Sequence, residues 1–179
     1  SKQISEEEFI EACQTEFVEL RFYVKQFAPD GSKALAALLS TYWVCGDHYD
    51  KFVRSQKQEN IRLSPTSWTK LQTWASEEVQ LTRDAEIVGA MLQFLSIANV
   101  GKIIPFRKIF APGYDDSAES LAHVLRHYPI LMPSFSRLSD DMQQMIQFST
   151  RADFNFGQFL QAENLPANLG IVKGILSEG

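Results

Sequence analysis

Apolar residues recur every three or four positions along most of the chain, which is the spacing of an amphipathic α-helix. Ser5 and Glu8 form a capping box at the start of the first such segment. Pro29-Asp30-Gly31 is a turn signal that should end it. The pattern therefore predicts one helix over residues 5–27, with an apolar face of Phe9, Cys13, Phe17, Leu20, Val24 and Phe27.

A second helix is expected to begin after a cap at Ser32, and Gly46 leaves two alternatives for its end. If the helix continues through residues 49–53, Asp50 falls within the apolar arc and needs a metal or an arginine as partner. If the helix ends at Gly46, Asp47 and Asp50 are solvated turn residues. Residues 55–60 are polar and predict a connection.

The most apolar segment follows Asp84 and is predicted to be the central helix, near residues 85–99. Its apolar positions cover an arc of about 160°, which is wide for a surface helix. Leu92 and Leu95 are expected in the core, and Gly101 should end the helix. Another helix is predicted just before it, starting at Ser64-Pro65.

The remaining segments predict further helices separated by irregular links. Residues 102–115 contain two prolines and a glycine and are expected to form a loop. Asp116 and Ser139 are expected to cap two more helices, and residues 155–177 to form one or two short ones. No segment alternates as a strand would. The sequence thus predicts an all-α fold, one domain over residues 1–179 with about six to eight helices around the central one.

Composition and charge narrow the class of protein. The chain is 45% hydrophobic and 22% charged, as in a globular protein, and no apolar run reaches the roughly 18–20 residues of a membrane span. The net charge is −5 and no basic stripe is visible, so we expect neither nucleic acid nor membrane as partner. Cys13 and Cys45 are expected to be isolated buried thiols. With no apolar signal segment at Ser1, a cytoplasmic location is expected.

Three histidines are the whole imidazole supply for any metal or acid–base site: His48, His123 and His127. His123 and His127 are four residues apart, so they either share a metal or belong to an exposed polar helix face. On a helical wheel, His127 lies nearer the apolar edge and is the better candidate for an internal role. The aromatic series Phe148, Phe154, Phe156 and Phe159 is interpreted as core rather than as a ligand site.

One group of short motifs resembles a known family. Ala98 to Ile103, then Pro105, then Ile109 to Gly113, and finally Arg126-His127-Tyr128-Pro129 are similar to the core of the HD superfamily. The nearest branch is the HD-GYP cyclic-dinucleotide phosphodiesterases. Members carry a His-Asp pair followed by Ile-Gly-Lys-Ile at the end of a buried central helix, then a Pro-Gly turn, and later a helix that ends in His-Pro. The resemblance covers residues 98–129.

The sequence departs from this family at the chemistry. Ala98 and Asn99 stand where members have the metal-binding His-Asp pair. Alanine cannot bind a metal, and a neutral amide is a poor substitute for a carboxylate. The metal ligands that remain as candidates are His48, Asp50 and His127, where the resemblance implies the two histidines. Without HD ancestry, the same letters are an ordinary helix end, with Asn99 assisting termination.

Two functions from different classes follow. The first is a non-catalytic helical domain that resembles a degenerate HD fold and binds a partner protein or a small ligand, with no cofactor. The alternative is a divergent metal-dependent phosphohydrolase of HD type, which uses a divalent transition metal held by His48, Asp50 and His127. A helical scaffold unrelated to the HD family is a third possibility.

Overall fold

The structure is a computed structural model that describes residues 3–28, 30–56, 58–78 and 84–151. These residues contain ten α-helices and no strand, which confirms the all-α prediction and slightly exceeds the expected helix count. The helices are α1 (Glu6–Glu16), α2 (Val18–Gln26), α3 (Asp30–Cys45), α4 (Tyr49–Ser55), α5 (Pro65–Thr73), α6 (Ala85–Ile97), α7 (Ile104–Phe110), α8 (Ser117–His127), α9 (Pro133–Ser136) and α10 (Asp140–Arg151). Short 3₁₀ turns cover η1 (Glu59–Ile61), η3 (Val100–Lys102) and η4 (Pro129–Leu131), and a π-helical turn, η2 (Trp74–Glu78), extends α5.

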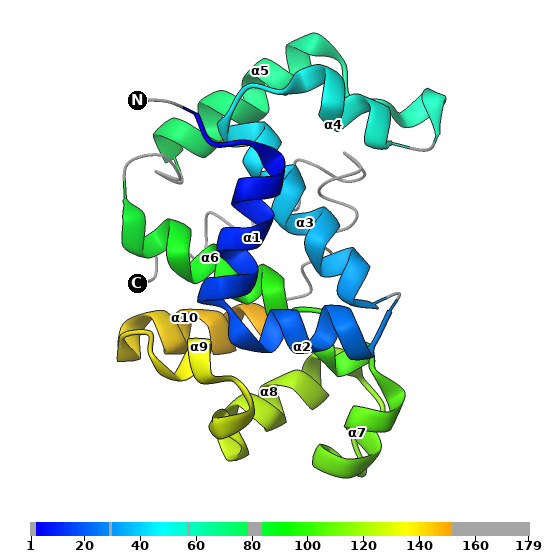
Figure 1. Ribbon diagram of the computed structural model, residues 1–179, viewed down its shortest axis with the longest axis vertical. Helices are drawn as coiled ribbons and strands as arrows, with labels where there is room; N and C mark the ends of the chain where they lie inside the picture. Colours follow the sequence, from blue (N-terminus) through cyan, green and yellow to red (C-terminus); the bar gives the residue numbers. More distant parts are fainter. Residues whose placement is uncertain (1–2, 29, 57, 79–83, 152–179) are drawn as a thin grey trace.

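The helices are arranged along one long axis (Figure 1). Helices α4 and α5 form one end of the molecule, and α7 and α8 form the opposite end. Helix α3 packs against α1, α2 and α6 between these ends. Helices α9 and α10, which come later in the sequence than α6, also pack against it. Helix α6 therefore contacts helices that precede it and helices that follow it in the sequence.

Helix α6 is the central helix that the sequence predicts. It contributes to three buried clusters, through Ala90 and Ile97 in the first, Val88 and Met91 at the edge of the second, and Leu95 in the third. In the described part of the chain, no single helix is long and apolar enough to cross a membrane; only the bent pair Ala85–Lys102 and Ile104–Phe110, at 87°, meets that criterion jointly.

The first helical segment is broken, so the prediction of one helix over residues 5–27 is wrong. Phe17, between α1 and α2, leaves the helical region with φ −102° and ψ 83°, and its side chain is buried in a cluster with residues of α3 and α6. Helix α3 also begins at Asp30 rather than after Ser32. Gly31 lies inside this helix and packs closely against α2. A Cβ at this position would be 2.5 Å from the Cα of Val24, so glycine is required here. Both departures come from packing between helices rather than from local preference.

Gly46 directly follows the end of α3, so this helix does not continue through residues 49–53. Helix α3 ends at Cys45, and Asp47 adopts the left-handed region with φ 58°. The Asp47 carboxylate accepts a hydrogen bond from the Trp68 indole at 2.9 Å, and Asp50 is exposed in the first turn of α4. Burial raises the pKa of the Cys13 thiol to about 11, whereas Cys45 is exposed, so only Cys13 matches the expected buried thiol.

The expected loop over residues 102–115 is wrong, because residues 104–110 of it form α7. Pro105 lies in the first turn of α7, where its missing N–H costs nothing, and Phe106 is buried against Tyr23 of α2. Phe148 is another departure, since 53% of its surface is exposed instead of lying in the core. Phe154, Phe156, Phe159 and the expected short helices of residues 155–177 lie outside the described residues.

Apart from Ser32, the helix starts marked by a capping side chain are confirmed. Ser5, Ser64, Asp84 and Asp116 each accept hydrogen bonds from backbone N–H groups of the first helical turn. Ser139 accepts a hydrogen bond from the N–H of Met142 at 3.4 Å, at the start of α10. These starts depend on residues close in sequence, which is why the sequence predicts them well.

Truncation of Leu95 tests the central position of α6. Leu95 is 1% exposed, so we expect Leu95→Ala to lower the free energy of unfolding by about 2–5 kcal/mol, measured by urea denaturation. The matched control is Ile104→Ala, on an exposed side chain, where a change within about 0.5 kcal/mol is expected. An unchanged free energy of unfolding in Leu95→Ala would contradict the placement of α6.

Candidate functional site

The three candidate metal ligands do not form one group. His48 precedes α4, where its ring stacks on Tyr42 with centroids 5.3 Å apart. Asp50 lies in the first turn of α4, whereas His127 ends α8 at the opposite end of the molecule (Figure 1). Within the described ranges, no three His, Cys, Asp or Glu residues are placed to hold a metal ion. The structure therefore does not bring His48, Asp50 and His127 together.

The two histidines of α8 lie side by side, with ring centroids 4.5 Å apart. The wheel argument assigned the internal position to His127, but His123 is the half-buried one and His127 is exposed. The reason is Tyr114, in the segment before α8. Its ring packs on the His123 ring, with the two ring centroids 4.7 Å apart. A wheel drawn from α8 alone cannot include that contact.

The end of α6 explains the glycine of the Gly-Lys-Ile motif. Ala98 caps α6, and Asn99 keeps an ordinary right-handed backbone with φ −93°, so it is not a left-handed terminator. A Cβ on Gly101 would lie 1.9 Å from the carbonyl oxygen of Ser117. Close packing of α8 on η3 therefore requires glycine here. This requirement is one of packing and involves no metal.

The α7–α8 end gathers exposed apolar side chains. Nine large apolar side chains are exposed in the described residues, and five of them lie between residues 104 and 130. Ile109 is 68% exposed and Ile130 is 86% exposed. We call the apex the surface made by Ile109, Tyr114, Tyr128 and Ile130, with the neighbouring cations Lys108 and Arg126.

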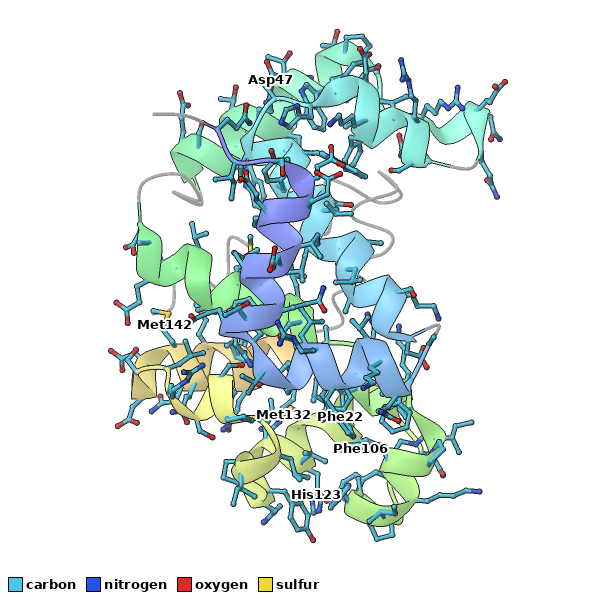
Figure 2. All side chains as sticks on the ribbon, in the orientation of Figure 1. Phe22, Asp47, Phe106, His123, Met132 and Met142 are labelled. Atoms are coloured by element: carbon cyan, nitrogen blue, oxygen red, sulfur yellow. The ribbon has the colours of Figure 1, made fainter. Side chains whose placement is uncertain are left out.

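Ring contacts join the parts of the apex. Phe110 at the end of α7 meets Tyr128 after α8 at 5.6 Å, and His123 lies 6.1 Å from Tyr128. Lys108 and Arg126 lie in the last turns of α7 and α8, where a cation is favoured by the helix dipole. Figure 2 shows His123 at this end and Asp47 at the other. These ring contacts join the end of α7, the segment before α8 and the end of α8.

The short link from Tyr128 to α9 presents Ile130, because Met132 and Ser134 further along it are buried. Met132 is fully buried, and Ser134 is 5% exposed. The Ser136 hydroxyl donates a hydrogen bond to the carbonyl oxygen of Pro129 at 2.8 Å, which closes the link on itself. Ile130 is therefore directed outward from a segment that is anchored on its inner side.

The anchor of this link is a buried polar junction between α2, α6 and α9, formed by Glu19, Gln93 and Ser134. The N–H of Ser134 donates to Glu19 Oε2 at 3.3 Å, and the Ser134 hydroxyl also bonds to the carboxylate. Gln93 Nε2 lies 3.2 Å from Glu19 Oε1 and 3.2 Å from Ser134 Oγ. No ion pair involving Glu19 occurs in the part of the chain that is described. These hydrogen bonds offset the cost of removing the carboxylate of Glu19, a residue that is 4% exposed, from water.

Other polar groups border the junction. Tyr23 lies one turn after Glu19 on α2, and its hydroxyl contacts the sulfur of Met132 at 3.8 Å. Burial, with a further contribution from the Glu19 carboxylate, raises the pKa of Tyr23. Gln93 Oε1 is buried without a hydrogen-bond partner among the described residues. The sequence offered one signal of this site, namely a glutamine in the middle of its most apolar segment.

Removal of the Glu19 carboxylate tests the junction. Glu19→Leu leaves the donors of Ser134 and Gln93 without their acceptor, and each buried group so left costs about 1–3 kcal/mol. We expect a loss of at least about 2 kcal/mol in the free energy of unfolding, measured by urea denaturation. Glu19→Gln, which keeps one acceptor oxygen, should lose less. A Glu19→Leu chain as stable as the parent would show that the junction contributes nothing.

Comparisons with known proteins give one result. Neither the curated proteins nor the solved structures include a significant match to this chain. A family model matches residues 4–177, nearly the whole chain. The chain therefore belongs to the family of unknown function DUF6829.

Proposed function

We propose that this chain is a non-catalytic helical domain, resembling a degenerate HD domain, that binds a partner protein through the apex. The observation that carries the proposal is the concentration of exposed apolar side chains at the α7–α8 end. Exposed apolar side chains concentrated at one end of a protein mark an interaction site more often than scattered single residues do. Tyrosine and arginine, both present in the apex, are also enriched at binding interfaces.

The rigidity of the apex supports the proposal. Ile130 follows Pro129 in a short 3₁₀ turn, and buried Met132 fixes the other end of that turn. A side chain held in this way loses little conformational freedom when a partner covers it. Ile109 and Ile130, the two most exposed apolar residues of the apex, are thus suited to act as anchors in a partner's pocket.

The substitutions at the HD motif support the absence of catalysis. Hydrolysis of HD type needs a metal to activate water and to offset charge on the phosphoryl group. Ala98 and Asn99 stand where members of the HD superfamily have the residues that hold that metal. The other candidate ligands lie at both ends of the molecule, with Asp50 on α4 and His127 on α8. The phosphohydrolase alternative therefore needs ligands other than the ones the sequence indicates.

Site-specific photocrosslinking tests the proposal. A photoreactive amino acid is placed at position 130 of the full chain, expressed in the cells that naturally produce it. We expect a discrete crosslinked protein partner from position 130, because Ile130 is the most exposed apolar residue of the apex. The matched control is the same amino acid at position 4, where Ile4 is also exposed but lies at the α1 end. No adduct is expected there.

Two outcomes would contradict the proposal. Equal crosslinking from positions 130 and 4, or none from position 130, would mean that the apex is not the binding surface. Metal-dependent hydrolysis of nucleotides or cyclic dinucleotides by the purified chain, lost in His127→Ala or His48→Ala, would favour the phosphohydrolase instead.

A further inference from the structure

The acidic residues of the chain avoid most of the segments that build the apex. Residues 87–114 and 120–139 contain no Asp or Glu, although the whole chain has a net charge of −5. The Lys and Arg residues in those two segments are Lys102, Arg107, Lys108, Arg126 and Arg137. The three acids between the segments, at positions 115, 116 and 119, all lie at or before the start of α8. The end of α8, where Tyr128 and Ile130 follow, is therefore basic in an otherwise acidic protein.

The cations of the apex have no acidic partner within residues 3–28, 30–56, 58–78 and 84–151. The ion pairs there join Lys33 to Asp30, Lys51 to Glu6, and Arg62 to Glu59, all outside the α7–α8 end. Lys108 and Arg126 are exposed and take part in none of them.

Two of the other charged groups nearby, Arg107 and Asp116, are engaged by hydrogen bonds of the fold. Arg107 donates to the backbone carbonyl oxygen of Asp115 at 3.0 Å. The Asp116 carboxylate accepts the N–H groups of Ala118 and Glu119 at 2.8 Å each. Lys108 and Arg126 are therefore the groups through which the apex can attract an oppositely charged partner.

Resting on the proposed function, we propose that the partner presents an acidic protein segment with large apolar side chains. Its apolar side chains cover Ile109, Tyr128 and Ile130, and its carboxylates face Lys108 and Arg126. Charge complementarity of this kind speeds association and rejects basic segments. The apolar contacts supply most of the affinity, because ion pairs at an exposed rim contribute little.

Anionic lipid and nucleic acid fit the apex less well than an acidic protein segment does. Binding to either depends on a large number of cations. The apex offers Lys108 and Arg126 on a chain whose net charge is negative.

Selection from a peptide library tests the partner's chemistry without assuming it. Random 16-residue peptides are selected on the immobilised full chain and counter-selected on the double variant Ile109→Ser, Ile130→Ser. Both replaced side chains are exposed, so the double variant should fold, which its circular dichroism and melting temperature check. We expect the enriched peptides to be rich in Asp and Glu, with two or more large apolar residues.

The dissociation constants of the enriched peptides, synthesised and measured by fluorescence anisotropy, identify the groups responsible. The double variant should bind about tenfold or more weakly, because it lacks both apolar anchors. Lys108→Gln with Arg126→Gln should weaken binding several-fold, and the difference from the parent should shrink at high salt. The matched controls Ile4→Ser and Lys33→Gln, at exposed positions away from the apex, should change nothing.

The outcomes separate this inference from the proposed function. Enrichment of basic or uncharged peptides, or of none, overturns the acidic partner, while a crosslink from position 130 would still support the apex as a binding surface. Peptides that bind the double variant as tightly as the parent overturn both. Vesicles of phosphatidylcholine and phosphatidylglycerol should not bind the chain. Sedimentation with them, lost in the double variant, would replace the protein partner with a lipid surface.

Discussion

Glu19 places a carboxylate in the interior of the molecule, where no lysine or arginine of the described residues accompanies it. A charge in this position is tolerated only when hydrogen-bond donors surround it. Those donors come from Gln93 on α6 and Ser134 on α9, which are 74 and 115 residues away in the sequence. Helices α2, α6 and α9 each supply one member of this hydrogen-bonded group. The group therefore holds the three helices in one arrangement.

This constraint reaches the surface through a short stretch of chain. Ser134 is fixed by the junction, and Met132 before it is fully buried. The backbone between Tyr128 and Met132 must then turn outward, which leaves Ile130 in solvent beside the ends of α7 and α8. The exposure of Ile130 is thus a consequence of how the interior is tied together. In the proposed function this rigidity is useful, because a partner meets a surface that is already formed.

The sequence was most informative where structure depends on near neighbours. The helix starts at Ser64, Asp84 and Asp116 were predictable, since each capping side chain bonds to backbone a few residues later. The break at Phe17 and the close approach at Gly101 were not, because both are imposed by helices distant in sequence.

The candidate site shows the same division. The pairing of His123 with His127 follows from helix geometry, whereas the burial of His123 depends on Tyr114 from another segment. The apex was not predictable, because exposure of Ile109 and Ile130 depends on the whole fold. Helix α7, which carries Ile109, was itself expected to be a loop.

The central claim, that the buried junction holds the link presenting Ile130, is tested most directly by amide hydrogen exchange in Ser134→Ala. The substitution removes the hydroxyl that bonds to Glu19 and Gln93 and leaves the rest of the link unchanged. The account predicts faster exchange at the protected amides of residues 131–136, with the amides of α3 exchanging as in the parent. Unchanged exchange in the link, or equal acceleration in the link and α3, would contradict it.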